Sequence, residues 1–256
     1  MIKVFRKLLC GSSMFCVTFF MSAILSAAEL TIRSSPTSTT LLELYTSQGC
    51  SSCPPAEKWL SNFTDNKKLW RELIPINFHV DYWDDLGWED PFATAEFSRR
   101  QRRYAEQGYS RNVGTPGFIV DGRGWTGWFQ RLWSKRKSLP LPAILPTHNL
   151  QAIISEEKIE LSYDDNTGDD LVAHIAILGF GIETDVRTGE NGGRKLRHDF
   201  VVIGYRTNRL SGKGRAEIFD LPKTLSVNSS RRGIVVWVAK TNDPTPLQVA
   251  GNWFKQ

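Results

Sequence analysis

Residues 40–60 read TLLELYTSQGCSSCPPAEKWL and contain a strand signal followed at once by a helix signal. Thr40–Thr46 is a short apolar run rich in β-forming residues, which predicts a strand. A serine of the Ser51-Ser52 pair can cap a helix, and Pro54 and Pro55 suit a first turn, where missing N–H groups cost nothing. The segment therefore predicts a strand that leads into a helix, with a Cys-x-x-Cys pair at the junction.

The two cysteines at this junction have the spacing for disulfide exchange. A thiol at a helix N-terminus faces free N–H groups and the positive end of the helix dipole, and both favour the reactive thiolate. Cys50, on the solvent side of the turn, is the expected nucleophile, and Cys53, inside the helix, is the expected resolving thiol. Three other interpretations remain open: a small structural disulfide, half of a zinc site, and a pair that no longer turns over.

The chain begins with the pattern of a secretory signal peptide. Residues 1–28 combine Lys3, Arg6 and Lys7, an uncharged apolar run and a small-residue cleavage site, Ser26-Ala27-Ala28. The apolar run is short and diluted by Gly, Ser and Thr, so a retained membrane anchor is the less favoured alternative. The mature chain is therefore expected in the periplasm or outside the cell, without a stable membrane anchor, where disulfides persist.

The composition is that of a globular protein, because 41% of the 256 residues are hydrophobic and 23% are charged. It excludes an intrinsically disordered chain. Without the signal peptide, the net charge of +5 falls to a balance of 29 basic against 27 acidic residues. No Lys/Arg face of the kind that binds a phosphate backbone is visible, so no nucleic-acid partner is predicted.

Residues 29–147 read as an α/β domain around the cysteines. Ile74–Val80 is the predicted second strand, and residues 91–107 form a predicted helix with Asp90 as its cap. After these come a hairpin and a last helix, predicted at Phe118–Asp121, Trp125–Trp128 and Phe129–Arg136.

The pattern changes after a proline-rich linker at residues 140–146. Residues 148–256 contain short β-type segments separated by turn residues, and these segments predict an all-β, sandwich-like domain. They are Leu150–Ile154, Ile159–Tyr163, Leu171–Leu178, Phe200–Tyr205, Ala216–Phe219 and Ile234–Val238.

Four blocks of the chain resemble the DUF1223 family. They are LELYTSQGCSSCPPA at residues 42–56, HVDYWDDLGWEDPF at 79–92, Thr115-Pro116 with Val120-Asp121-Gly122, and GENGGR at 189–194 followed by HDFVV at 198–202. The resemblance implies an exported bacterial protein of unassigned function, with a thioredoxin-like domain that bears the cysteines and a β-rich extension. The chain departs from the family pattern at Gly117, where a polar residue such as Gln is expected.

The resemblance also implies roles for residues around the cysteines. Thioredoxin-like folds carry a cis peptide bond at a Thr-Pro pair that faces the cysteines, so Pro116 is expected to shape a docking groove and Thr115 to bind substrate. Apart from the resemblance, the aromatic residues within the acidic stretch 81–90 suggest an aromatic wall beside the site, in which Trp83 is expected to bind substrate. Pro116 follows Cys53 by 63 positions, and this long gap implies an inserted helix, which residues 91–107 supply.

Glu43 is a candidate proton acceptor. Thioredoxin-like proteins often keep an acid six residues before the first cysteine, beneath the second thiol, where it takes the proton of that thiol. The spacing here is seven, so an extra loop residue must bulge. The alternative is an exposed or edge-strand glutamate.

No resident metal or organic cofactor is predicted. The alternative metal site joins Cys50, Cys53 and His79, since two thiolates and an imidazole suit Cu(I). The competing interpretation is a strand-end histidine that packs within the fold. Gly189–Arg194 lacks the Gly-Lys-Ser/Thr ending of a phosphate loop, so we expect a structural or docking role for it.

The sequence therefore predicts an exported thiol–disulfide oxidoreductase. Cys50 attacks or transfers a disulfide, Cys53 resolves it, and the partner is a protein or small molecule that carries a thiol or disulfide. Two alternatives stay open. One is a copper-delivery module, and the other is a non-catalytic binding module on a thioredoxin-like scaffold.

Overall fold

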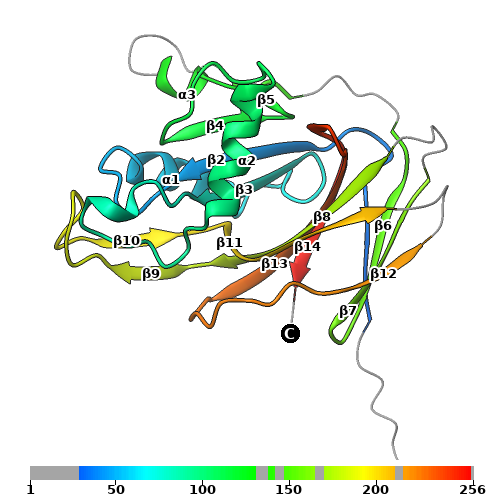
Figure 1. Ribbon diagram of the computed structural model, residues 1–256. Coiled ribbons are helices and arrows are strands. Elements are labelled where there is room, and N and C mark those ends of the chain that lie inside the picture. Colours follow the sequence, from blue (N-terminus) through cyan, green and yellow to red (C-terminus); the bar gives the residue numbers. More distant parts are fainter. Residues whose placement is uncertain (1–28, 131–137, 142–146, 165–169, 211–215, 255–256) are drawn as a thin grey trace, which may run out of the picture.

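The computed structural model describes residues 29–130, 138–141, 147–164, 170–210 and 216–254. These residues form a mixed α/β structure that is mostly strands (Figure 1). An eight-stranded mixed sheet has the order β14-β13-β8-β11-β3-β2-β4-β5, and a separate antiparallel sheet has the order β1-β6-β7-β12. Strands β9 and β10 pair with each other. The predicted signal peptide lies outside the described residues.

The strands and helices have the following bounds. The strands of the first half are β1 (Leu30–Arg33), β2 (Thr40–Thr46), β3 (Leu73–His79), β4 (Gly117–Val120) and β5 (Arg123–Gly124). The helices are α1 (Pro54–Ser61), α2 (Ala95–Glu106), the short α3 (Gly127–Gln130) and a 3-10 turn, η1 (Asp84–Leu86). The second half contains β6 (Leu150–Ser155), β7 (Lys158–Tyr163), β8 (Leu171–Phe180), β9 (Ile182–Asp185), β10 (Lys195–His198), β11 (Val201–Leu210), β12 (Glu217–Asp220), β13 (Arg231–Lys240) and β14 (Asp243–Phe254).

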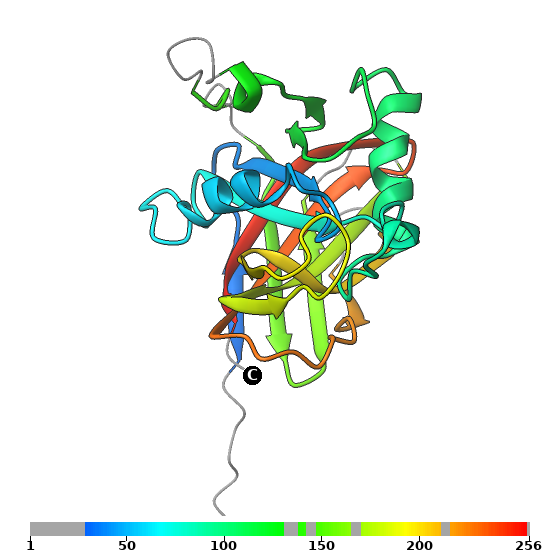
Figure 2. The same ribbon diagram turned by 90° about the vertical axis from the view of Figure 1, so that its left-hand side faces the viewer.

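Helices α1 and α2 cover opposite faces of the central strands (Figure 2). On one face, Trp59 of α1 packs edge-on against Phe118 of β4 at 5.5 Å between ring centroids. On the other, Phe97 of α2 packs against Phe78 of β3 at 4.9 Å. Because successive side chains of a strand point to opposite faces, each residue of β2 faces either α1 or α2. This alternation decides which side chains can reach the cysteines.

The two halves of the chain share one sheet. β11 pairs in parallel with β3 at Val201 and Asn77, and it pairs antiparallel with β8 along its length. The N-terminal β1 crosses in the other direction and pairs with β6 of the second half. The predicted boundary at residues 147/148 is therefore no boundary between sheets, because strands from both sides of it are hydrogen-bonded neighbours.

A second apolar core lies between the two sheets. Ile175, Ile177 and Val236 of the large sheet pack with Ile154 and Leu161 of the four-stranded sheet. This layering matches the sandwich predicted for the second half only in part, because the two sheets also contain β1 to β5 of the first half. The eight-stranded sheet of this sandwich also continues into the first half, through the pairing of β11 with β3.

Several predicted elements need correction. Helix α2 begins at Ala95 with Thr94 as its cap, and Asp90 instead binds other groups described below. Residues 125–128 form no strand, since β5 ends at Gly124 and α3 begins at Gly127. The predicted helix Phe129–Arg136 overlaps α3 at its first two residues, and residues 131–137 lie outside the described part.

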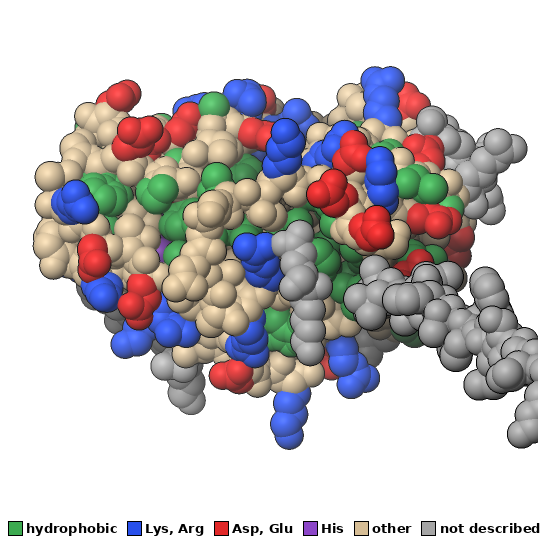
Figure 3. All heavy atoms as spheres, turned by 90° about the horizontal axis from the view of Figure 1, so that it is seen from below, with side chains coloured by type: hydrophobic (Ala, Val, Ile, Leu, Met, Phe, Trp, Pro, Cys, Tyr) green, Lys and Arg blue, Asp and Glu red, His purple; other side chains and the backbone are tan. Residues whose placement is uncertain are grey.

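Charges of both signs are interspersed on one face of the molecule. The face seen from below in Figure 3 carries lysine and arginine side chains interspersed with aspartate and glutamate. Among the described residues, no helix is long and apolar enough to cross a membrane.

Candidate active site at the cysteine loop

The cysteine loop, residues 47–53, connects β2 to α1, as the sequence predicted. Cys50 and Cys53 form a disulfide with a Cα–Cα distance of 5.5 Å, and Cys53 is the N-cap residue of α1. Cys50 was expected on the solvent side, but it is 1% exposed and Cys53 is 0% exposed. The exposed tip of the loop is Ser51-Ser52. The disulfide is therefore covered, and its covering residues matter for access.

One side of the disulfide faces the predicted docking residues. The Thr115–Pro116 peptide bond is cis, as predicted, and the carbonyl oxygen of Thr115 lies 3.7 Å from the sulfur of Cys50. The indole of Trp83 donates a hydrogen bond to the hydroxyl of Thr115 at 2.8 Å. A Cβ atom on Gly49 would lie 3.2 Å from Cβ of Trp83, so the indole stands directly against the cysteine loop. Trp83, Thr115 and Pro116 thus gather beside Cys50.

The glycine that departs from the family pattern has a steric reason. A Cβ atom on Gly117 would lie 2.6 Å from the carbonyl oxygen of Gly114 and 2.7 Å from Nε2 of Gln101. Gln101, from α2, donates a hydrogen bond to that same carbonyl at 2.7 Å. A side-chain amide from another element therefore occupies the space that a residue at position 117 would need.

A hairpin from the second half covers the other side of the cysteine loop. It comprises β9, β10 and the connection at residues 186–194, and it lies beside the first half in both ribbon views (Figures 1 and 2). Asn191 is fully buried and donates to the carbonyl oxygens of Gln48 at 2.8 Å and Cys50 at 3.0 Å. The carboxylate of Glu190 accepts a hydrogen bond from the N–H of Ser51 at 2.9 Å. The sequence predicted only a structural or docking role for this segment, and no local signal placed it here.

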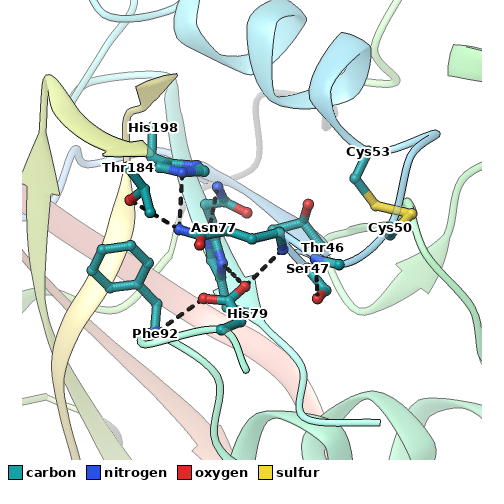
Figure 4. Close-up of polar contacts among 12 residues, drawn as sticks. Thr46, Ser47, Cys50, Cys53, Asn77, His79, Phe92, Thr184 and His198 are labelled. Carbon is teal, nitrogen blue, oxygen red and sulfur yellow. Dashed lines mark hydrogen bonds and ion pairs between the residues drawn. A yellow bond between two sulfur atoms is a disulfide. The ribbon is translucent and has the colours of Figure 1, made fainter. Parts of the chain in front are cut away.

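A buried polar cluster lies under the cysteine loop (Figure 4). Glu57 projects from α1, accepts from the hydroxyl of Thr46 at 2.8 Å and lies 2.5 Å from Nδ1 of His198. The amide of Asn77 donates to the same carboxylate at 3.3 Å. Burial raises the pKa of Glu57, but the charge and hydrogen bond of His198 outweigh it, so the net pKa is lowered.

The second acid–base pair of the cluster is His79 with Asp90. Nδ1 of His79 lies 2.7 Å from Oδ2 of Asp90, which also accepts from the N–H of Gln48, while Oδ1 of Asp90 accepts from the N–H of Phe92. Burial raises the pKa of Asp90, but the charge and hydrogen bond of His79 outweigh burial, so the net pKa of Asp90 is lowered. Burial lowers the pKa of His79, and Asp90 reverses this and raises it. Asp90 therefore fixes the positions of His79 and of the cysteine loop, and it does not cap α2.

His79 does not join the cysteines. Its ring packs near the ring of His198, at 5.3 Å between centroids, and points away from the disulfide (Figure 4). The alternative copper site of Cys50, Cys53 and His79 is therefore not assembled. Instead the donor atoms of Glu57, His79 and His198 lie within 4.8 Å of one another.

Glu43 also lies elsewhere than predicted. Its carboxylate accepts two hydrogen bonds from Arg100, both at 2.8 Å, and further ones from the hydroxyls of Tyr45 and Tyr104 at 2.7 and 2.6 Å. These partners lie on the α2 face of the sheet, whereas Thr46 of the same strand contacts Glu57 on the α1 face. Glu43 is thus held away from Cys53, and the prediction that it lies beneath that thiol is wrong.

Comparisons with known proteins identify the family and the fold. A family model described as a protein of unknown function, DUF1223, matches residues 41–239. The crystal structure of an Agrobacterium tumefaciens protein is similar, with a TM-score of 0.52 and 22% identity, over 86% of this chain and 94% of that one. HBP35 of Porphyromonas gingivalis has a TM-score of 0.53 at 12% identity, over 86% of this chain and 76% of that chain. No curated protein matches the chain.

Proposed function

Because the chain belongs to the DUF1223 family, whose function is unassigned, we propose a function from its site: an exported thiol–disulfide oxidoreductase on a thioredoxin-like scaffold. One observation carries the proposal. The Cys50–Cys53 disulfide stands at the start of α1, and the Thr115–Pro116 pair lies against the sulfur of Cys50. A partner strand that docks along residues 115–117 would meet Cys50 first.

The exchange starts from the oxidised pair. A thiolate of the partner attacks the sulfur of Cys50, the bond to Cys53 breaks, and Cys53 leaves as a thiolate that takes up a proton. A second thiolate of the partner then attacks the mixed disulfide, which releases an oxidised partner and leaves both cysteines reduced. Two electrons pass from the partner to the pair, and the reverse sequence reduces a disulfide. The N-terminus of α1 stabilises the thiolates.

The surroundings of Cys50 set which partners fit. Trp83 and Thr115 form one wall, and Glu190 with Asn191 form the other. Because Cys50 is 1% exposed, a bulky partner needs these walls to part before it can reach the sulfur. The site therefore suits an extended segment or a small thiol better than a folded surface.

The reduction potential of the pair tests the proposal. Residues 29–256 are equilibrated in glutathione buffers, and the fraction of reduced cysteines is measured by mass after alkylation. We expect a potential between about −120 and −270 mV, the range of catalytic exchangers. A potential below about −300 mV, or thiols that never equilibrate, would leave a structural staple on a non-catalytic binding module.

A trapping experiment separates the roles of the two cysteines. In Cys53→Ser, the mixed disulfide on Cys50 has no resolving thiol, so it should accumulate with a cysteine peptide carrying an activated disulfide. In the matched Cys50→Ser variant, the remaining thiol is the N-cap residue of α1 and does not have the Thr115 carbonyl against its sulfur, so it should react more slowly. Equal labelling of the two variants would contradict the assignment of Cys50 as nucleophile.

A further inference from the structure

The cluster beneath the cysteine loop has the composition of a metal site. Glu57, His79 and His198 come from α1, β3 and β10, and all three side chains are buried. We infer that they bind one divalent ion of the zinc type, with two imidazole nitrogens and one carboxylate oxygen as ligands. This inference does not depend on redox activity of the cysteines.

The ligand atoms follow from the hydrogen bonds already made. Nδ1 of His79 is taken by Asp90, which leaves Nε2 to face the cluster. Glu57 offers Oε2 and His198 offers Nδ1, which lie 2.5 Å apart. Ligand atoms around a tetrahedral zinc ion lie roughly 3.4 Å apart, given bonds of about 2.0–2.2 Å. This pair would open by about 1 Å, and His79, now within 4.8 Å of both, would move inward.

The groups behind two of the ligands match the outer shell of a metal site. Metal-binding histidines usually donate their other N–H to a carboxylate, and Asp90 accepts from His79 in this way. Asp90 is itself held by the backbone N–H groups of Gln48 and Phe92. Thr46 donates to Oε1 of Glu57 and leaves Oε2 for the ion. Two of the three ligands are therefore oriented before any ion arrives.

Asn77 offers a fourth donor. It is 0% exposed, and its Oδ1 is buried with no hydrogen-bond partner among the described residues. Its Nδ2 lies 3.3 Å from Glu57 and 3.4 Å from Nε2 of His79, so the amide group stands against the cluster. A half-turn of that amide would place the unpartnered oxygen beside both ligands. An orphaned oxygen at this place is explained if a cation takes it as a ligand.

The contact between Gln48 and His198 disfavours ion binding and limits the affinity of the site for the metal. Gln48 accepts from the indole N–H of Trp88 at 2.9 Å, so its Nε2 is the atom that faces Nε2 of His198 at 3.1 Å. That arrangement favours the proton of His198 on Nδ1, whereas an ion on Nδ1 needs the proton on Nε2. A mismatched outer-shell partner typically costs 10–100-fold in metal affinity. Gln48 therefore weakens the site.

A pocket borders two of the three ligand residues. A pocket of about 320 Å³ between α1 and β10 is lined by Glu57 and His198. Its rim carries Lys58, Arg194, Lys195 and Arg197. These positive charges repel a free cation, so we expect slow loading of the folded chain and rapid loading during refolding.

Metal content and thermal stability test the inference. Residues 29–256 are stripped with a chelator, refolded with Zn²⁺, dialysed and analysed for zinc and for Tm. We expect one zinc per chain and a Tm that rises with zinc concentration, because the ion joins three elements of the folded state. Less than about 0.1 zinc per chain after refolding, with no shift in Tm, would overturn it.

Variants locate the ion. His198→Gln should lower zinc affinity at least 100-fold, and Gln48→Glu, which supplies an acceptor for Nε2 of His198, should raise it 10–100-fold. The control His148→Gln changes a histidine that is 52% exposed, and it should bind zinc as the parent does. A Cys50→Ser/Cys53→Ser double variant should keep its zinc. Loss of zinc in that double variant with retention in His198→Gln would assign the ion to the cysteines instead.

A measurement on the unmodified chain covers the case in which His198→Gln does not fold. Co²⁺ bound by four nitrogen and oxygen ligands gives strong visible absorption without a thiolate-to-metal charge-transfer band. We expect that spectrum from the oxidised, unsubstituted protein. Weak bands typical of six-coordinate Co²⁺, or a thiolate band, would contradict the site.

Discussion

The buried side chain of Arg100 makes polar contacts that join α2 to the large sheet. Its guanidinium makes a two-pronged contact with Glu43, donates to the hydroxyl of Tyr104 at 2.9 Å and lies 5.2 Å from the ring centroid of Trp237. Both charges of the pair are buried, at 7% and 0% side-chain exposure. Each charge is therefore tolerated only because the other is present.

Removing one partner of this pair should be far worse than removing both. Arg100→Met leaves the Glu43 carboxylate buried without a counter-charge, so we expect a loss of about 3–5 kcal/mol in the free energy of unfolding. Adding Glu43→Gln should restore much of that loss because no buried charge then remains. Urea denaturation of the two variants measures both values. An Arg100→Met loss below about 1 kcal/mol would mean that water reaches the site.

Asp121 makes stability depend on pH in the acid range. Its carboxylate accepts from the N–H of Leu41 at 2.8 Å, and burial raises its pKa to about 6 from the ordinary value of 3.8 for an aspartate. The folded chain thus binds this proton more tightly than the unfolded chain. The contribution of Asp121 to stability is full below pH 4 and is lost as pH rises from about 4 to 6.

Asp121→Asn should remove this dependence. The amide oxygen can still accept from Leu41, and asparagine tolerates the positive φ of 46° at this position. Relative to the parent, the variant should gain about 1–2 kcal/mol at pH 7 and little at pH 4. Unfolding curves at the two pH values measure the difference. An equal effect at both would show that Asp121 does not titrate in this range.

At the residue scale, the sequence was informative where local chemistry decides position. The strand-to-helix signal placed Cys50 and Cys53 between β2 and α1, whereas the cis bond beside them was expected from the resemblance to thioredoxin-like folds. Glu43 was misplaced because all seven residues of β2 are buried, so polarity does not alternate along the strand. Without that alternation, counting residues cannot tell which face a side chain occupies.

At the scale of elements, the β9–β10 hairpin contributes most to the site with the weakest sequence signal. Both strands are four residues long and mostly polar, which gives little periodicity. Its connection nevertheless supplies Asn191, whose amide satisfies two carbonyl groups of the cysteine loop. Contacts between residues so far apart in sequence depend on how the whole chain folds, which no local pattern records.

Asn191→Ala should expose the disulfide to small thiols. It removes two hydrogen bonds of about 1 kcal/mol each, so the open form of the loop should become roughly tenfold more populated or more. The rate of reduction by dithiothreitol under native conditions should rise in proportion. Asn228→Ala, at an exposed position, is the matched control. Unchanged reduction in Asn191→Ala would show that Trp83 and Thr115 alone limit access.

At the scale of the whole molecule, the shared sheet predicts that the first half does not fold alone. Residues 29–147 lack β11, which covers the edge of β3, and they lack Tyr205 and Trp237 beside Phe78 and Arg100. We expect this fragment to show no cooperative thermal transition, while residues 29–256 do. Circular dichroism and two-dimensional NMR compare the two. A cooperative, dispersed fragment would restore the predicted pair of independent domains.

The partition into two domains was inferred from the change of strand pattern after the proline-rich linker at residues 140–146, and that local pattern does not show which strands pair across the linker. The segments predicted after residue 148 are strands in the structure, and β14 was missed because its polar and apolar residues do not alternate cleanly. Which strand lies next to which depends on long-range register. The Val201–Asn77 pairing that fuses the halves leaves no trace in either local sequence.

The same pairing has a consequence for the order in which the chain is made. A nascent chain that has been synthesised only past residue 79 holds β2 and β3 with both outer strand edges open. β4 closes the edge of β2 once residues 117–120 are added, but β11 does not exist until residue 201 is added. An open, apolar edge is a template for pairing with other chains. During this stretch of synthesis, a chaperone or rapid completion of the chain must therefore prevent the open edge from pairing with another chain.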